Sequence, residues 1–155
     1  MVQTALRALR YQLKLQKFSL RVRFTRKDRV IRADADAVVD ALINILSNAM
    51  KYSVERKHIV VSTYRRNNYV AVSVQDRGVG ISQKDLSHIF DPYFRSRDEM
   101  TKGIGGVGLG LSVVQHVMNA HGGKVEVSSS LGKGTTFTLL FPTEVRGEAY
   151  PRDRR

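Results

Sequence analysis

The sequence contains no cysteine, which excludes several classes of protein at once. Without a thiol, the chain can have no disulfide framework, no thiolate metal site and no cysteine nucleophile, and this fits a reducing compartment. No run approaches the ~20 apolar residues of a membrane-spanning helix, and the charged start lacks the apolar stretch of a signal peptide. We therefore expect a cytoplasmic chain, and leave open that a full-length protein is membrane-anchored.

Acidic residues are scarce: 14 Asp and Glu stand against 26 Lys and Arg, which gives a formal net charge of +12. The excess lies at the N-terminus, where residues 1–32 carry ten basic residues and one acid, whereas residues 33–142 carry twelve and ten. A basic arm can bind nucleic acid, but this one lacks interleaved aromatic residues, finger spacing and any RNA-binding signature. We therefore expect no nucleic-acid partner, and interpret the arm as a solvated face or a face for a partner segment.

The length fits one domain, which we expect over residues 1–145, and the charged tail at 146–155 is expected to be disordered. In chain order, the expected elements are a helix at 3–17, a strand at 18–24, a helix from Asp34 or Asp36 to Lys51, strands at 58–64 and 69–76, a short helix capped by Ser82, a helix at about 107–120, and strands at 124–129 and 135–141. This order favours an α+β fold, a two-layer α/β sandwich, over repeated βαβ units.

Glycine is concentrated at 103–110, where the sequence reads GIGGVGLG. The spacing matches a dinucleotide-binding turn, but that turn needs a strand directly before the glycines, and here an irregular segment at 91–106 precedes them. A P-loop is also excluded, because no Gly-Lys-Ser/Thr follows four spacer residues. The pattern predicts a phosphate site at a helix N-terminus, with a flexible hinge as the alternative, and residues 91–106 are expected to form a mobile lid.

A polar stripe interrupts the apolar helix before Lys51. Asp40, Asn44, Asn48 and Tyr52 recur every four residues and so share one slowly drifting face. A buried unpaired amide costs about 1–3 kcal/mol, so the stripe needs partners. An asparagine oxygen suits Mg²⁺, which takes one or two protein ligands together with phosphate oxygens. The alternative is a buried asparagine that bonds a neighbouring loop.

Asp76 continues the apolar row of Val70, Val72 and Val74 at the end of its expected strand. A carboxylate in that position needs strong hydrogen-bond donors, and the exocyclic amine of adenine is one candidate. Guanine would be rejected, because it presents an acceptor at the same place. The alternative is that Asp76 only caps the glycine-rich turn that follows it.

Five motifs in this order resemble the catalytic ATP-binding domain of sensor histidine kinases, which shares a superfamily with the ATPases of DNA gyrase, the heat-shock chaperone and mismatch repair. They are NILSNAMKYS (N box), DRGVGIS (first glycine box), IFDPYFRS (F box), GGVGLGLSVV (second glycine box) and LGKGTTFTLLFP (closing strand pair). The resemblance covers residues from about 5 to 142. It implies a mixed five-stranded sheet covered on one face by three helices, with ATP held between the helices and a flexible lid.

The resemblance also implies roles for the matching residues. Asn48 would ligate Mg²⁺, Asn44 would support the phosphates or the metal, and Lys51 would reach phosphate. The other nucleotide contacts would come from Tyr52, Asp76, Gly78, Gly80, Ile81 and Thr136 near the base, and from Gly106, Gly108, Leu109, Gly110 and Leu111 near the phosphates. Arg95 and Lys102 are the catalytic candidates, because they could neutralise γ-phosphate charge. Phe90, Tyr93 and Phe94 would anchor the lid.

The reaction is expected to be transfer rather than hydrolysis. Hydrolytic relatives carry a glutamate four residues before the metal asparagine, whereas this chain has Asn44, and a neutral amide cannot act as a general base. The resemblance therefore implies a protein histidine kinase, a phosphotransferase of two-component signalling that uses ATP and Mg²⁺.

The phosphate acceptor is not identified in this chain. The four histidines (His58, His88, His116 and His121) lack the context of a phosphoacceptor and are expected to be structural. The implied partners are a phosphoacceptor-histidine dimerisation domain, on the same or a partner chain, and a response regulator, and the isolated domain is expected to be a monomer. Two alternatives stay open: a stand-alone relative that phosphorylates or sequesters a regulatory protein, and a basic nucleic-acid-binding module.

Overall fold

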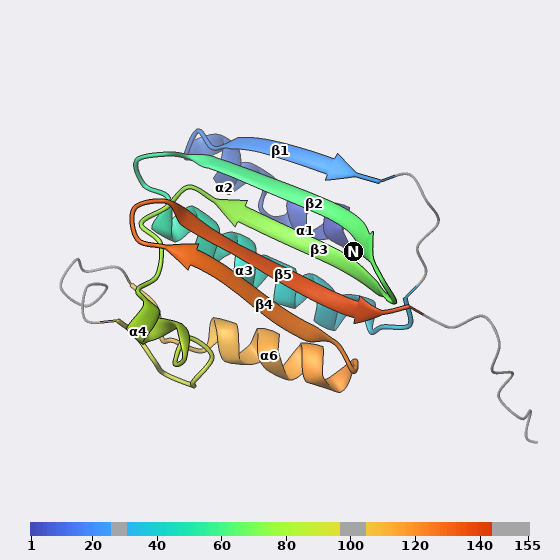
Figure 1. The fold of residues 1–155 in the computed structure, drawn as a ribbon. Helices are drawn as coiled ribbons and strands as arrows, with labels where there is room; N and C mark the ends of the chain where they lie inside the picture. Colours follow the sequence, from blue (N-terminus) through green and yellow to red (C-terminus); the bar gives the residue numbers. More distant parts are fainter. Residues whose placement is uncertain (26–30, 97–104, 144–155) are drawn as a thin grey trace, which may run out of the picture.

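A mixed five-stranded sheet forms one layer of the structure and helices form the other (Figure 1). The structure, a computed structural model, describes residues 1–25, 31–96 and 105–143. The sheet has the order β1-β2-β3-β5-β4, in which β1 pairs parallel with β2 and every other pair is antiparallel. The strands are β1 (Ser19–Phe24), β2 (His58–Arg66), β3 (Tyr69–Asp76), β4 (Lys124–Ser130) and β5 (Gly134–Pro142). The predicted α+β sandwich is confirmed.

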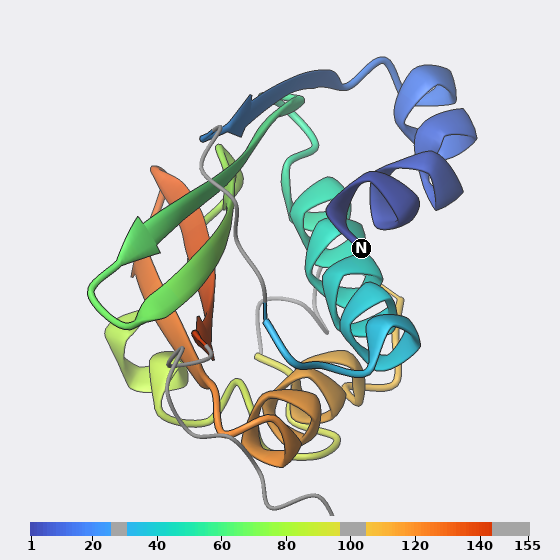
Figure 2. The same cartoon turned by 90° about the vertical axis from the view of Figure 1, so that its right-hand side faces the viewer.

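The larger helices lie on one side of the sheet, and the other side is open (Figure 2). The helices are α1 (Val2–Ala8), α2 (Arg10–Leu15), α3 (Ala35–Tyr52), the short α4 (Gln83–Leu86) and α6 (Gly110–Ala120). The central helix is α3, which contacts α1, α6 and β3.

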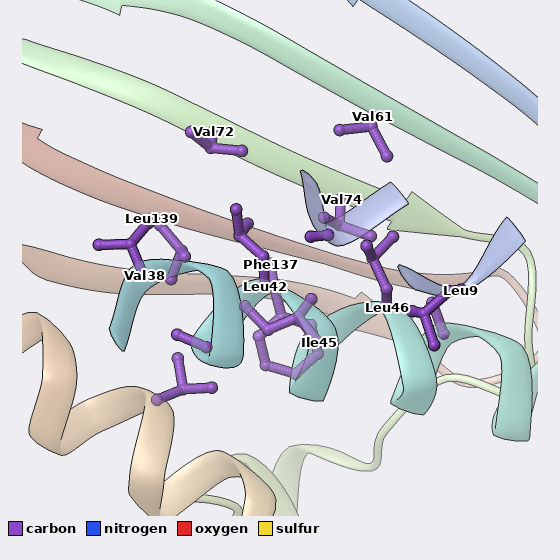
Figure 3. Close-up of a cluster of buried hydrophobic side chains, with 14 of the residues drawn as sticks. Leu9, Val38, Leu42, Ile45, Leu46, Val61, Val72, Val74, Phe137 and Leu139 are labelled. Atoms are coloured by element: carbon purple, nitrogen blue, oxygen red, sulfur yellow. The ribbon is translucent and has the colours of Figure 1, made fainter. Parts of the chain in front are cut away.

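Helix α3 carries most of the helical side of the core. Asp34 is its N-cap, since one carboxylate oxygen accepts from the N–H groups of Asp36 at 3.0 Å and Ala37 at 3.1 Å. Leu42, Ile45 and Leu46 are each 1% exposed and face the sheet, where Figure 3 shows Val74 and Phe137 opposite them. Burial of these apolar side chains fixes the rotation of α3 against the sheet. The direction in which the polar stripe of α3 points is therefore fixed as well.

The predicted helix at 3–17 is broken at Leu9 into α1 and α2. The break is a local kink, because Leu9 N–H still donates to the Ala5 carbonyl at 3.2 Å and Leu13 N–H to the Leu9 carbonyl at 2.9 Å. The spacing of Leu6, Leu9, Leu13 and Leu15 predicts an amphipathic helix. Leu9 and Leu13 are each 6% exposed, as that spacing predicts, but Leu15 is 66% exposed. Leu15 lies two residues after Leu13 and so cannot share its helix face.

Three further boundaries differ from prediction. The helix predicted from 107 begins at Gly110, and Val107 lies outside it with 69% of its surface exposed. The connection between the strands predicted at 58–64 and 69–76 is shorter than predicted, because β2 includes Arg65 and Arg66 and pairs Arg66 with Tyr69. Asn67, with φ 54°, makes the turn, a backbone region that asparagine tolerates better than most residues. The last difference is the short helix capped by Ser82, which is expected over SQKDLSHIF, whereas α4 covers only Gln83–Leu86 and His88 follows it.

Three of the histidines make local contacts that agree with structural roles. His121 links two helices: its Nδ1–H donates to the Val117 carbonyl at 2.7 Å, and its Nε2 accepts from Asp34 N–H at 2.9 Å. His88 Nδ1 lies 2.9 Å from an Asp91 carboxylate oxygen, and His58 Nδ1 lies 3.2 Å from the Ser19 hydroxyl. His116 is exposed on α6. The two bonds of His121 hold the end of α6 against the start of α3.

No helix within the described ranges combines the length and hydropathy needed to cross a bilayer. The cytoplasmic location stays a prediction.

Candidate nucleotide-binding site

A cavity of about 1000 Å³ opens between α3, the ends of β3 and β5, and the loop that leads into α6. Most of the predicted site residues line it: Asn44, Asn48, Lys51, Tyr52, Asp76, Gly80, Ile81, Arg95, Gly106, Gly108, Leu109, Gly110 and Leu111. Residues more than 60 positions apart in the sequence therefore meet at one site. Lys102 lies outside the described residues.

Helix α3 presents its asparagines to the cavity. Asn44 Nδ2 donates to the Asp40 carbonyl at 3.1 Å, which directs its amide oxygen toward α6. Asn48 lies one turn later and also lines the cavity, whereas Asp40 does not. Lys51 follows, with its Nζ 4.8 Å from the centroid of the Tyr52 ring. The polar stripe thus places two neutral amides and a cation along one wall.

The start of α6 forms the facing wall. At Gly110 a Cβ atom would lie 2.9 Å from the Asn44 amide oxygen, and at Gly106, with φ +142°, it would lie 2.8 Å from Lys51 Nζ. Helix α6 has no side-chain cap and no acidic residue in its first turn. Its first N–H groups therefore face the cavity without a competing carboxylate, which favours an anion.

Asp76 lies at the opposite end of the cavity and is 6% exposed. Its Oδ1 accepts from Gly78 N–H at 2.7 Å and from Thr135 N–H at 3.2 Å. Burial raises the pKa of the Asp76 carboxyl, while these two bonds and the nearby Ser53 hydroxyl oppose the rise. Asp76 thus both caps the glycine turn, as the alternative interpretation held, and faces the cavity.

The sequence matches a known family over most of its length. A family model described as "Histidine kinase-, DNA gyrase B-, and HSP90-like ATPase" matches residues 33–145. The chain belongs to this ATPase family. Its structure has the fold of the catalytic domain of histidine kinase ThkA, with a TM-score of 0.79, 23% identity, and coverage of 92% of this chain and 91% of that one.

Two further comparisons concern whole kinases. The sensor histidine kinase WalK of Bacillus subtilis (strain 168) is 38% identical over 118 residues, which are 75% of this chain and 19% of WalK. Full-length ShkA, solved in complex with AMPPNP, matches with a TM-score of 0.78 and 23% identity, over 92% of this chain and 29% of ShkA. This ATPase chain therefore spans less than a third of each of these two kinases.

One predicted site residue, Thr136, does not line the cavity. Thr136 pairs with Gln75 and Ser128, and the alternation of β5 directs it away from the cavity, which Thr135 and Phe137 line. Thr135 N–H is also the group that bonds Asp76. Gly78 is not in the cavity wall, but a Cβ there would lie 2.4 Å from the Tyr52 carbonyl, so glycine is needed for the turn.

The structure contains a hydroxyl network behind Asp76 that the sequence analysis does not predict. The Ser129 hydroxyl accepts from Ile81 N–H at 2.8 Å, donates to the Gly134 carbonyl at 3.1 Å and lies 2.8 Å from the Thr135 hydroxyl. It thereby ties the glycine turn to the β4–β5 hairpin. Strand alternation places Ser129 on the face of Val125 and Val127, but a serine in SSS carries no other signal.

The lid prediction is testable only for its ends, because residues 97–104 lie outside the described part. Tyr93 N–H donates to the Gly108 carbonyl at 2.9 Å, which joins the F box to the glycine loop. Phe94 lines the cavity and its ring lies 5.6 Å from that of His88. Phe90 packs against the core, whereas Tyr93 is 68% exposed.

The side chains that line the cavity could hold Mg²⁺ together with phosphate. Within the described ranges, no group of three or more His, Cys, Asp or Glu residues could hold a metal by itself. Asn48 and Asn44 offer neutral oxygens in the cavity, which suits a cation that keeps most of its ligands from water and phosphate.

Gly80 supports a stability prediction. It has φ +73°, and a Cβ would lie 2.1 Å from the Ser130 carbonyl oxygen. We expect Gly80→Ala to lower the free energy of unfolding by about 3 kcal/mol or more, because strain and a backbone clash add. The matched control is Gly122→Ala, with φ +60° and nothing within 4 Å, which should cost about 1 kcal/mol. Equal losses in urea denaturation would contradict the clash.

The pKa of Asp76 predicts a pH dependence of stability. In the folded chain this pKa lies above the ordinary value of 3.8. The folded state therefore holds the proton more tightly than the unfolded state, and the stability this gives is present below pH 3.8 and is lost as pH rises through the folded pKa. As pH rises, urea denaturation of the nucleotide-free chain should show a fall in the free energy of unfolding that the Asp76→Asn protein lacks. Parallel pH profiles for the two proteins would contradict the raised pKa.

Proposed function

We propose that this chain binds Mg-ATP and transfers the γ-phosphate to a histidine on a separate dimerisation and phosphoacceptor domain. The carrying observation is the single cavity that joins a buried carboxylate, suited to adenine, to an uncapped helix N-terminus suited to phosphate. The family to which the chain belongs and the kinases that it resembles support the proposal.

The base would lie at the Asp76 end. Because Oδ1 already accepts from Gly78 and Thr135, Oδ2 is the oxygen left for the adenine amine. Guanine presents a carbonyl oxygen there, and two acceptors would then face each other in a buried site. ATP is therefore favoured over GTP by the direction of one hydrogen bond.

The phosphates would lie between α3 and the start of α6. The N–H groups at the helix start and Lys51 supply positive charge, and Asn44 and Asn48 would hold Mg²⁺ with the phosphate oxygens. When bound, Mg²⁺ neutralises phosphate charge during transfer. Arg95 lines the same cavity and would add a further cation near the γ-phosphate, and Lys102 is proposed for the same role.

The residues of the cavity favour transfer over hydrolysis. Among the residues that the structure describes, two carboxylates line it, Asp76 and Asp85. Asp76 is assigned to the base, and Asp85 Oδ2 accepts from the Ser82 hydroxyl at 2.8 Å. The amide of Asn44 cannot activate water as a glutamate would. A protein acceptor that approaches the γ-phosphate is then the productive route.

The test is phosphorylation in trans. The chain is mixed with γ-labelled ATP, Mg²⁺ and the histidine-bearing domain of a sensor kinase. We expect label on the acceptor that is lost in acid and kept in base, and no label on an acceptor with His→Gln. Release of inorganic phosphate without labelled protein would contradict the proposal. A response regulator would then take the phosphoryl group from the histidine.

A further inference from the structure

The outer edge of β1 is an open strand edge. β1 lies at the end of the sheet order and, among the described strands, pairs only with β2. Figures 1 and 2 show no described helix or strand across this edge. An unpaired edge presents a row of backbone N–H and C=O groups that another extended segment can pair with. The opposite edge strand, β4, lies beside α6.

The N-terminal segment that contains β1 is basic, and none of its exposed cations forms an ion pair with another described residue. Residues 1–25 contain no Asp or Glu and carry six exposed cations: Arg7, Arg10, Lys14, Lys17, Arg21 and Arg23. The ion pairs in the described part of the chain are Arg66–Glu126 and His88–Asp91, and neither involves these six. Uncompensated charge of one sign weakens the folded state, and a partner of opposite sign would relieve it.

The inner side of β1 is apolar and partly uncovered. Val22 and Phe24 are 37% and 46% exposed, although Val61, the β2 partner of Val22, is 1% exposed. Phe18 and Leu20, at the start of the strand, pack against the core. The two faces of β1 therefore differ, with Arg21 and Arg23 on the open face of the sheet and Val22 and Phe24 on the core face.

We propose that β1 is a docking edge for an extended acidic segment of a partner protein, which adds as a sixth strand. Alternating acidic and apolar residues would match the two faces, since side chains of neighbouring strands pair directly across. Edge arginines protect the strand against indiscriminate pairing, and the same charges select an acidic partner. A second copy is disfavoured, because two such edges would bring like charges together. This inference does not depend on the nucleotide site.

The probe is a blocked peptide of alternating Glu and Val, with a Lys-and-Val peptide as its charge-reversed control. We expect the full chain to bind the acidic peptide at low ionic strength, and hydrogen exchange to slow at residues 19–24 only with that peptide. Arg23→Glu should weaken binding about tenfold. Lys124→Glu makes the same charge change on the opposite edge strand and should leave binding of the acidic peptide unchanged. Phe24→Ser tests whether the apolar side of β1 contributes to this binding.

Four results would overturn the proposal. The first two are equal binding of both peptides and an equal loss of peptide binding in Arg23→Glu and Lys124→Glu. The third is a dimer in sedimentation that protects β1 from hydrogen exchange without peptide. The fourth is attachment to vesicles of anionic phospholipid, with no protection from exchange by the acidic peptide. Thermal unfolding of each variant confirms that a loss of binding is not a loss of fold.

Discussion

Replacing Asp76 by Asn should lower the affinity of the chain for ATP about 100-fold and leave the fold intact. The Asn Oδ1 can keep the two bonds from Gly78 and Thr135 N–H, so its amide NH₂ takes the place of Oδ2. Two donors then face each other at the adenine amine, and a lost hydrogen bond to a charged group costs about 1.5–3 kcal/mol. Calorimetric titration measures the affinity.

The control for this substitution is Gln75→Ala. Gln75 is the neighbouring residue of β3, and it is exposed on the other face of the sheet. The Gln75→Ala protein should bind ATP with the same affinity as the unchanged chain. An Asp76→Asn protein with unchanged affinity would remove the carboxylate from base recognition and leave it only its role as cap of the glycine turn.

Replacing Asn48 by Ala should abolish the enhancement of ATP binding by Mg²⁺ and lower phosphotransfer about 100-fold. Asn48 lines the cavity one helical turn from Asn44, so its loss removes one of two neutral oxygens available to the metal. The affinity for ATP without Mg²⁺ should change little, because the base contacts lie at the other end. Titration with and without Mg²⁺ separates the two effects.

Ser47→Ala is the matched control, since Ser47 lies on α3 beside Asn48 but outside the cavity wall. It should keep both the Mg²⁺ effect and the transfer rate. If Asn48→Ala still showed the full Mg²⁺ effect, the metal would have to lie elsewhere in the cavity.

Periodicity predicted the layers of the fold because each long element has one strongly apolar face. Helix α3 is the clearest case, with its cap at Asp34 and its buried stripe both legible in the sequence. Boundaries were less predictable. Val107 continues the helical spacing of α6, yet Gly108, with φ +79°, and its contact with the F box delay the helix to Gly110.

The site was predictable where chemistry is unusual for its location. Amides on an apolar helix and a carboxylate at the end of an apolar strand both stand out, and Asn44, Asn48 and Asp76 do meet in the cavity. Ser129 could not be predicted, since its role depends on three partners brought together only by the sheet. Whether Thr135 or Thr136 lines the cavity depends on the register of β5, because a shift of one residue exchanges the side chains on the two faces of the sheet.

The most direct test of the account is calorimetric titration of the unchanged chain with ATP, ADP and GTP, each with and without Mg²⁺. The account predicts that both adenine nucleotides bind, that Mg²⁺ strengthens ATP binding, and that GTP gives no heat of binding. Equal binding of GTP and ATP would contradict the assignment of Asp76 to the base, and no binding of any nucleotide would contradict the assignment of the cavity.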